Sequence, residues 1–491
     1  MDRRAFSKNA MMLGLGAGVA VVQSFGQEGV TVDKPESKGY YEEPSKKLPV
    51  REFDVVVAGG GTAGVFAALA AARQGAKTML IESKGYCGGI AVEGGTALHS
   101  FYNLYTAFPG CKKRQVVQGI PDEFIARLTG MGGCSGYPEM ETGRGYDSIC
   151  TAVDTELYKL LAFEMLEEAG VLVAVHTLLV GAIKDGDRLK GVITESRSGR
   201  EAVMANSFID CTGYGDLCGH AGAQFTVPND YPSCNSFSLA NASIDDYYLF
   251  LKSHNAVGQV CRGLRDGEEG GFVRMGAEQL NISGLSDEAK KIGMAMITTT
   301  VRENYLMFIK INYKVPESVL NRDDMAKAEI EVRKRMNKGA QLLRQYIPGF
   351  EKAFIARTSP SLCIRRGRLI TCDYDITHED VIEGRHFNDD VFVYGFHDMA
   401  PKYQIKDGGT YGIPYRALCV KGIENLYAAG MMITSDHRAH MSTRNTVSCM
   451  GQGQAAGTAA ALCALKKCCS RDLKYSTLKQ TLVDHKVYFE G

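Results

Sequence analysis

The sequence has no excess of charge of either sign and no long apolar run. Its 491 residues include 56 Lys and Arg against 56 Asp and Glu, a formal net charge of zero, and the two signs are interspersed. Without a basic field, the chain is not expected to bind nucleic acid or an anionic membrane surface. No apolar stretch reaches the roughly 18 to 20 residues that a transmembrane helix needs, so no transmembrane segment is expected.

Cysteine is abundant, but it lacks the spacings that identify many cysteine-bound cofactors. The fifteen cysteines include no C-x-x-C, as in redox and zinc sites, and no C-x-x-C-H, as in covalent haem attachment. An iron–sulfur cubane needs four thiolates brought together, and these thiols are dispersed along the chain. We therefore expect no metal site, and interpret most of the cysteines as small buried hydrophobes.

A complete βαβ pattern lies between Phe53 and Ser83. An apolar run, Val55–Ala58, leads into the turn Gly59–Gly64, which reads G-x-G-x-x-G, and an alanine-rich helical segment follows. A second apolar run closes with Glu82, placed where such units use an acid to accept from ribose hydroxyls. Strand, helix, second strand and acid together predict dinucleotide binding. A glycine-rich loop in another α/β fold is the alternative.

Each residue of the turn has an expected role. Gly59 permits the tight turn, Gly61 lets the backbone approach a pyrophosphate, and Gly64 lets the helix pack close to the strand. The phosphates then meet free amide groups at the helix N-terminus, where Thr62 and Ala63 lie. Since this is the only such glycine pattern in the chain, a separate nicotinamide domain is not expected.

The N-terminus looks like a twin-arginine export signal. Arg3 and Arg4 precede a short apolar stretch, Ala10–Val22, and small residues follow it. We expect residues 1–26 to be the signal, residues 27–50 to be a linker, and the protein to be exported to the periplasm or beyond the cell. An ordinary secretory signal or an internal helix is the alternative.

The βαβ rhythm returns further along the chain. A helix expected over Asp154–Ala169 precedes a buried strand, Val171–Val175, and a hairpin over residues 178–195. A strand expected over Ala202–Ile209 then ends in a second glycine turn, Asp210–Asp216. Glycine turns at the carboxyl ends of strands are where doubly wound sheets bind nucleotides.

These patterns predict an α/β fold. We expect a Rossmann-type dinucleotide-binding domain with a central parallel sheet, discontinuous in sequence, and an inserted α+β domain that faces the substrate. The inserted stretch lacks βαβ rhythm and contains a long charged helix, expected from about Asp323 to Tyr346. The expected boundaries are 51–104, 151–222 and 415–470 for the dinucleotide-binding domain, 105–150 for an insertion, 223–414 for the substrate domain and 471–491 for a C-terminal tail.

Five separated motifs occur in an order that a known family shares. They are Gly59–Gly64 with Glu82, Cys87-Gly88-Gly89, Asp154-x-Glu156, Asp210-Cys211-Thr212-Gly213-x-Gly215-Asp216-Leu217, and Asn425–Gly430 with Gly453-Gln454-Ala455-Ala456-Gly457. With them, most of residues 53–465 resembles the secreted FAD-dependent oxidoreductases of the glutathione-reductase-like Rossmann type, a family grouped with heterodisulfide reductase A subunits.

The resemblance implies that FAD is the cofactor. The four-iron cluster of the heterodisulfide reductase relatives is not expected, because nothing here reproduces its cysteine spacing. The residues expected at FAD are Gly59, Gly61, Thr62, Ala63 and Gly64 at the pyrophosphate, Glu82 at the adenosine ribose, Gly88 and Gly89 beside a ring, Val175 near the adenine, Gly213, Asp216 and Gly430 in the phosphate cradle, and Gln454 near the flavin pyrimidine.

Candidate catalytic residues follow from chain order. The loop between Gly430 and Gln454 has to pass along the cofactor, and it carries His437 and Arg444. Arginine offers a planar charged fork for a substrate oxygen or carboxylate, and histidine exchanges protons near neutral pH. Ordinary ion pairs of the arginines with Asp373, Asp380 or Asp436 are the alternative. The candidates are Arg365, His397, His437 and Arg444, with Arg368 and His99 as weaker members.

The sequence therefore predicts a flavoenzyme that moves a hydride between FAD and a small organic substrate. The electron donor or acceptor that completes the cycle is not identified, and a homodimer is left open. A flavin-bearing electron-transfer or binding subunit without substrate chemistry of its own is the alternative.

Overall fold

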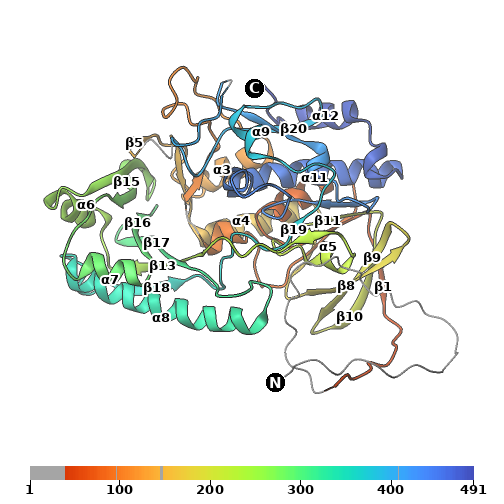
Figure 1. The fold of residues 1–491 in the computed structure, drawn as a ribbon, viewed down its shortest axis with the longest axis horizontal. Coiled ribbons are helices and arrows are strands. Elements are labelled where there is room, and N and C mark those ends of the chain that lie inside the picture. The colour runs from red at the N-terminus through yellow and green to blue at the C-terminus, as the bar shows by residue number, and fades with distance from the viewer. Residues whose placement is uncertain (1–38, 95–96, 144–147, 407, 491) are drawn as a thin grey trace, which may run out of the picture. The chain divides into compact units, whose positions relative to one another are not determined.

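The computed structural model of the protein describes residues 39–94, 97–143, 148–406 and 408–490 (Figure 1). The export signal expected over residues 1–26, with the first part of the expected linker, lies outside the described residues. The rest of that linker has no regular structure until β1 (Val50–Glu52) begins. None of the described helices is both long and apolar enough to cross a membrane.

A five-stranded parallel sheet lies at the centre of the largest hydrophobic core in the described chain. Its order is β22-β11-β2-β3-β7, and its strands are β2 (Val55–Ala58), β3 (Thr78–Ile81), β7 (Leu172–Ala174), β11 (Ser207–Asp210) and β22 (Leu426–Ala428). Four of these strands are buried along their whole length, as expected for a parallel sheet covered on both faces. The predicted Rossmann-type domain, discontinuous in sequence, is confirmed.

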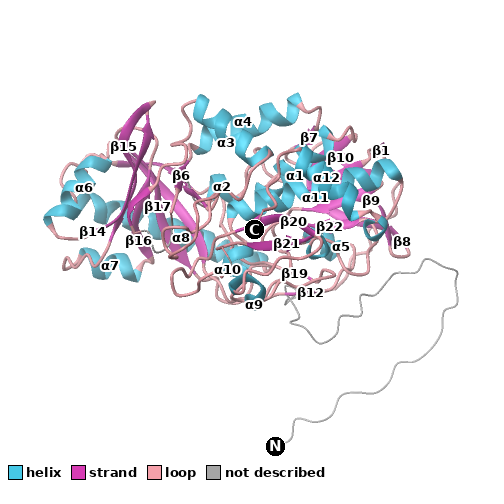
Figure 2. Cartoon of the chain, turned by 90° about the horizontal axis from the view of Figure 1, so that it is seen from above, coloured by secondary structure: helices cyan, strands magenta, loops and turns pink. Residues whose placement is uncertain are grey.

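Two small-residue helices cross closely above this sheet (Figure 2). They are α1 (Thr62–Arg73) and α11 (Thr446–Lys466). A Cβ added at Gly453 would lie 2.1 Å from the Ala63 carbonyl oxygen, and one at Gly457 would lie 2.1 Å from the Ala67 carbonyl oxygen. The glycines of α11 therefore permit backbone contact with another helix.

The strand expected over Ala202–Ile209 is two strands in different sheets. The first, β10 (Gly199–Met204), joins β9 (Arg188–Ser196), β8 (Leu178–Asp185) and β1 in a four-stranded sheet, whereas β11 joins the parallel sheet. Between them the backbone changes partners, because the Ala205 amide donates to the Lys190 carbonyl and the Asn206 amide donates to the Asp54 carbonyl. Hydrophobicity alone does not mark this switch.

An antiparallel sheet forms the centre of a second core, at the opposite end from β8, β9 and β10 in Figures 1 and 2. Its described strands are ordered β18-β13-β17-β16-β15-β14-β5. Helices α6 (Ile244–Ser253), α7 (Leu285–Lys291) and α8 (Arg322–Tyr346) pack against it. The strands are β5 (Met140–Thr142), β13 (Ser233–Ala240), β14 (Val257–Arg265), β15 (Glu268–Ala277), β16 (Met294–Thr299), β17 (Tyr305–Tyr313) and β18 (Phe354–Thr358).

The expected substrate domain, 223–414, is divided between the two cores. Its part from β13 to β18 builds the antiparallel sheet, which also takes in β5 from the 105–150 insertion. The later part packs into the core of the parallel sheet, through residues such as Ile370, Val391 and Ile413. The C-terminal stretch, expected as a tail, contains α12 (Tyr475–Asp484), which is buried in that same core at Leu478 and Leu482.

The remaining elements are short or connect these sheets. They are α2 (Ile90–Glu93), β4 (Ala97–His99), α3 (Ile120–Gly130), β6 (Cys150–Ala152), α4 (Thr155–Glu168), α5 (Asp216–His220), β12 (Phe225–Thr226), β19 (Leu369–Ile370), α9 (His378–Ile382), β20 (Asp390–Tyr394), β21 (Tyr411–Pro414), η1 (Tyr415–Ala417), α10 (His440–Thr443) and η2 (Ser470–Asp472).

Candidate active site

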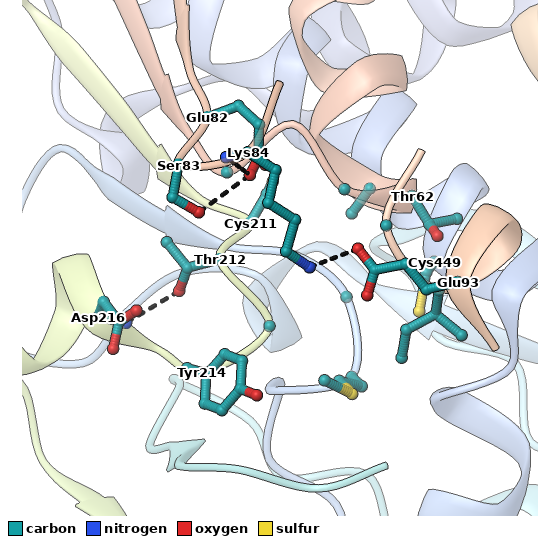
Figure 3. A pocket seen from close by; sticks show the side chains of 18 of the residues that line it. Thr62, Glu82, Ser83, Lys84, Glu93, Cys211, Thr212, Tyr214, Asp216 and Cys449 are labelled. Carbon is teal, nitrogen blue, oxygen red and sulfur yellow. Dashed lines mark hydrogen bonds and ion pairs between the residues drawn. The ribbon is translucent and has the colours of Figure 1, made fainter. Parts of the chain in front are cut away.

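The carboxyl ends of four parallel strands open on one cavity of about 310 Å³, here called the first cavity (Figure 3). Its wall contains the turn after β2, the end of β3, residues 211–214 after β11, and Gly430 after β22. Figure 3 shows Glu82 and Lys84 on one side of it and Thr212, Tyr214 and Asp216 on another. This is the edge of a parallel sheet at which nucleotides bind.

The glycines of the turn after β2 serve two purposes. Some permit close backbone packing, and one leaves space beside the cavity. A Cβ at Gly59, where φ is +94°, would lie 2.6 Å from the Cys211 carbonyl oxygen, and one at Gly64 would lie 1.8 Å from the Gly59 carbonyl oxygen. These two glycines allow β2, β11 and α1 to approach one another. A Cβ at Gly61 would meet no atom nearer than 3.8 Å, so this glycine leaves room beside the cavity.

The N-terminus of α1 presents hydrogen-bond donors to the first cavity. Its N-cap residue, Gly61, provides no side-chain cap, and Thr62 and Ala63 line the cavity. The first amide groups of a helix have no partner within the helix, and the helix dipole adds positive potential there. Together they form a site for a phosphate or pyrophosphate.

Glu82 is held rigidly at the cavity wall. Its side chain is 9% exposed, and one carboxylate oxygen accepts from the Gly60 amide at 2.7 Å. The other oxygen accepts from the Lys84 amide at 2.8 Å and the Ser83 hydroxyl at 3.0 Å. A carboxylate has about four acceptor sites, so one is left for a ligand hydroxyl.

The opposite wall is organised by Asp210 and Arg368. The Asp210 carboxylate is fully buried and accepts from the Thr212 amide at 3.0 Å and the Cys218 amide at 2.8 Å, which closes the turn after β11. Asp216, in the wall itself, accepts from the Arg368 guanidinium at 2.9 Å. The weaker candidate Arg368 therefore orients a wall residue and does not itself line either cavity in the described chain.

Two expected FAD contacts are not in the described wall of the first cavity. The Gln454 side chain is buried against α3, where its oxygen accepts from the Ile120 amide at 3.0 Å. The start of α11 lines the cavity instead, through Thr446 and Cys449. Val175 is also displaced from the wall, which is formed by residues 177–179 at the start of β8. The order of the motifs along the chain predicted which two segments lie near the first cavity. It did not predict which residues of those segments face the cavity.

The glycine pair after Cys87 is divided in the same way. Gly89 lines the first cavity, whereas Gly88 packs against Val92 and Tyr158, whose atoms a Cβ would approach to 2.8 Å and 3.1 Å. Gly88 still contributes its carbonyl oxygen, which accepts from the Thr62 hydroxyl at 3.1 Å.

Glu93 and Lys84 were not among the residues expected at the site. Both line the first cavity, where they form an ion pair that is visible in Figure 3. Glu93 is 4% exposed and also accepts from the Tyr86 hydroxyl at 2.8 Å. An acid at the end of a short apolar helix, α2, was the available signal.

A second cavity of about 360 Å³ continues from the first. The two share wall residues from four segments: Ile90, Cys363, Ile364, Met431, Arg444 and Thr446. The second cavity extends to the antiparallel sheet. On β17, Ile309 and Ile311 belong to the core beneath the sheet, whereas Phe308 and Lys310 line the cavity. This alternation follows from the two-residue repeat of a strand.

Two of the four catalytic candidates, Arg365 and Arg444, line the second cavity. Arg444 belongs to both cavity walls and forms an ion pair with Asp398. Its guanidinium also lies 5.7 Å from the centre of the Tyr231 ring. Through Arg444, the loop after Gly430 reaches both cavities.

His397 is not at either described cavity, and its surroundings make it a structural residue. The ring is fully buried, with Nδ1 accepting from the Met399 amide at 3.1 Å and Nε2 donating to the Arg438 carbonyl at 3.1 Å. Burial lowers its pKa to about 4. A neutral imidazole whose N–H donates to one backbone group and whose other nitrogen accepts from another is not placed to exchange a proton with a substrate.

His437 is also outside the described walls of both cavities. Its side chain is half exposed, pairs with the Asp230 carboxylate at 2.7 Å and stacks on Tyr231 with ring centres 4.8 Å apart. Arg366 pairs with the same carboxylate at 2.5 Å. This is an ordinary ion-pair network, formed with Asp230 and not with Asp373, Asp380 or Asp436, the aspartates of the alternative interpretation.

The weaker candidate His99 does line the second cavity. Arg274 Nη1 lies 3.3 Å from its Nε2, and burial, followed by the Arg274 charge, holds the pKa of His99 well below its ordinary value. Arg274, Lys310, Gln259 and Cys234 of the same wall were not singled out from the sequence, because they lie on strands of a sheet whose pairing the sequence does not reveal.

The fifteen cysteines are all free thiols in the structure. Cys463 and Cys468, with four residues between them, lie at the end of α11 and line neither cavity. Across the described residues, no three side chains of His, Cys, Asp or Glu are grouped so that they could hold a metal ion.

Comparison with known proteins places the chain in a family. Solved structures of similar fold include a geranylgeranyl bacteriochlorophyll reductase-like protein from Thermoplasma acidophilum, at 13% identity over 89% of this chain and 83% of that chain, with a TM-score of 0.43. Another is p-nitrophenol 4-monooxygenase from Pseudomonas putida, at 13% identity over 89% and 84%, with a TM-score of 0.41. Residues 54–482 match the family described as FAD dependent oxidoreductase, and the chain belongs to that family, with FAD as its cofactor.

Proposed function

We propose that this flavoprotein transfers a hydride between FAD and a small organic substrate bound in the second cavity. The observation that carries the proposal is the continuity of the two cavities through a shared wall. A ligand that fills the first cavity from the α1 N-terminus toward Ile364 and Met431 reaches the second cavity at that wall. A subunit that only passed electrons would not need this second enclosed space.

The residues of the first cavity fit the parts of FAD. The α1 N-terminus suits the pyrophosphate, Glu82 suits the adenosine ribose, and Gly430, which lines the cavity without a side chain, leaves room beside the phosphates. Bound FAD supplies the redox chemistry by taking up or giving up a hydride at its ring system.

The protein's own part is to orient the substrate and to manage charge and protons. Arg444 is held by Asp398 at the junction of the cavities, where its fork can bind a substrate oxygen and offset negative charge on the cofactor ring. Cys234 raises the pKa of Lys310, but burial and the Arg365 charge outweigh it, so the Lys310 pKa is lowered. Lys310 Nζ therefore releases a proton more readily than a solvated lysine.

The test is an anaerobic reduction of the purified holoprotein. A panel of sugars, hydroxy acids and amines is added, and flavin absorbance is followed; the same panel in oxidised form is added to chemically reduced protein. We expect at least one compound to bleach or restore the absorbance at a saturable rate. If the flavin exchanged electrons with redox proteins but with none of these compounds, the proposal would be contradicted. That result would favour the alternative function, an electron-transfer subunit.

We also propose that the chain is exported by the twin-arginine route and is grouped with heterodisulfide reductase A-like flavoproteins. Export is supported by Arg3 and Arg4 ahead of the apolar stretch, and by the FAD cofactor, because the twin-arginine route passes proteins that have already folded around a cofactor. Replacing both arginines by lysine should leave unprocessed precursor in the cytoplasm. Normal processing of that variant would contradict the export route.

A further inference from the structure

Cationic side chains converge on the second cavity from four separate parts of the chain. Arg274 comes from β15, Lys310 from β17, Arg365 from the segment after β18, and Arg444 from the turn between α10 and α11. Like charges in one partly buried space repel one another, and each loses hydration there. A protein that keeps such a group gains most when a ligand of opposite charge binds among them.

The described wall of this cavity contains no carboxylate of its own. Its acidic group is the Cys234 thiol; burial raises the pKa of this thiol, but the Arg365 and Lys310 charges outweigh that effect and lower it. Even with a full thiolate at Cys234 and with the Asp398 carboxylate paired to Arg444, the four cations keep a positive excess. Asp398, which pairs with Arg444, belongs to neither described cavity wall.

Two of the cations are held so that they present donors to a ligand. Gln259 accepts from Arg274 Nε at 2.9 Å and Nη2 at 2.7 Å, which fixes the plane of the guanidinium in the wall. Arg444 pairs with Asp398 through Nη2, while its Nε is buried and has no hydrogen-bond partner among the described residues. A buried donor of this kind is costly unless a ligand satisfies it.

Apolar side chains form a further part of the wall. Ile90, Ile297, Phe308, Ile364 and Met431 line it, and three of them also lie beside the first cavity. An anionic head group would thus be bound by the cations while an uncharged body rests against aliphatic and aromatic side chains. The forks of two arginines match the planar oxygens of a carboxylate.

We infer that the second cavity binds a small organic acid through its carboxylate, and that this acid is the substrate class of the enzyme. The inference rests on the proposed function, because it assigns a ligand to the cavity that function requires. Neutral alcohols, amines and sugars of the same size would leave the cationic group uncompensated and are excluded as preferred substrates.

The test measures binding to the purified holoprotein, separately from turnover. The probes are benzoate and hexanoate, their neutral amides benzamide and hexanamide, and phenyl phosphate, titrated while flavin absorbance is recorded. We expect both carboxylates to bind at least roughly tenfold more tightly than their amides, as for loss of a charge-assisted hydrogen bond. Equal affinity of acid and amide would overturn the inference, and binding of phenyl phosphate without the carboxylates would overturn the choice of carboxylate.

Variants connect the binding to the cationic group. Lys310→Met and Arg365→Gln should each weaken benzoate binding by roughly tenfold or more while benzamide binding is unchanged, and Lys310→Arg should retain it. Arg262→Gln is the matched control, since Arg262 lies on the same sheet but pairs with Glu141 at an exposed position. Flavin content and melting temperature show whether each variant is folded. Unchanged benzoate affinity in folded Lys310→Met and Arg365→Gln would overturn the inference.

The same samples separate this inference from the proposed function. Saturable carboxylate binding without flavin reduction or reoxidation by any compound would contradict hydride transfer and support the anion site. Flavin reduction by neutral compounds alone would support hydride transfer and overturn the anion site.

Discussion

At the scale of single residues, the protein surrounds its buried histidines so that they stay neutral. Burial is the main cause that lowers the pKa of both His397 and His440. The Arg366 and Arg444 charges lower the pKa of His440 further. Each ring is also hydrogen-bonded to a backbone carbonyl, of Arg438 for His397 and of Arg365 for His440. These rings shape loops around the site, while permanent charge at the site comes from arginine.

The neutral state of His397 predicts a pH-dependent loss of stability. Its folded pKa of about 4 lies below its ordinary value of 6.5, so the unfolded chain binds the proton first as pH falls. The contribution of neutral His397 to the free energy of unfolding is complete above pH 6.5 and is lost as pH falls from 6.5 to about 4. It amounts to roughly 3 kcal/mol. Urea unfolding of wild type and His397→Asn at several pH values should give a shallower pH dependence for the variant. Identical slopes over this window would contradict the prediction.

Glu82 predicts how strongly the protein retains FAD. Glu82→Ala removes an acceptor at the ribose position, a charge-assisted hydrogen bond of about 1.5 to 3 kcal/mol, so FAD should dissociate on the order of tenfold to a hundredfold more readily. Equilibrium dialysis of the apoprotein against FAD measures this. Glu168→Ala, at an exposed position on α4, is the control and should bind FAD normally. Unchanged affinity in Glu82→Ala would remove this residue from the ribose site.

Arg444 lies at the cavities and His437 does not, so alanine substitutions at these two residues of one loop should affect turnover differently. Arg444→Ala should retain FAD but lose on the order of a hundredfold in turnover, because an orienting group at the cavity junction is gone. His437→Ala should keep nearly wild-type turnover, since its ring lies at the surface beside Asp230. Rapid-mixing measurements of flavin reduction with the identified substrate compare the two. A large loss in His437→Ala, or none in Arg444→Ala, would reverse this assignment.

At the scale of elements, the crossing of α1 and α11 positions both ends of the flavin site. The N-terminus of α1 faces the phosphates, and the first turn of α11 lies in the shared wall of the cavities. Because the two helices touch backbone to backbone at Gly453 and Gly457, their relative position is fixed by steric contact.

Two helical glycines therefore predict opposite effects of the same substitution. Gly457→Ala puts a methyl group 2.1 Å from the Ala67 carbonyl oxygen, so it should destabilise the protein by about 1 to 3 kcal/mol and weaken FAD retention. Gly130→Ala in α3 meets no atom within 4 Å and should stabilise by up to about 1 kcal/mol. Thermal unfolding with and without added FAD measures both. Equal effects at the two positions would contradict the steric explanation.

At the scale of the whole molecule, much of the parallel-sheet domain was predictable because its information is local. The glycine turn, its flanking apolar strands and Glu82 lie within one short stretch, and each residue type has one physical reason to be there. The long helix α8 and the helix α4, with Asp154 as its N-cap, were likewise readable from periodicity and capping.

Only the tertiary structure decided which residues meet in the second cavity. His99, Lys310 and Arg365 come from distant segments, and a strand side chain faces the cavity or the core according to register, which changes with every bulge in β13, β14 and β16. The sequence by itself determined the cofactor-binding motif, because close backbone approach to phosphate requires glycine wherever it occurs. It did not determine the substrate pocket, because four cations become one site only after non-local strand pairing brings them together.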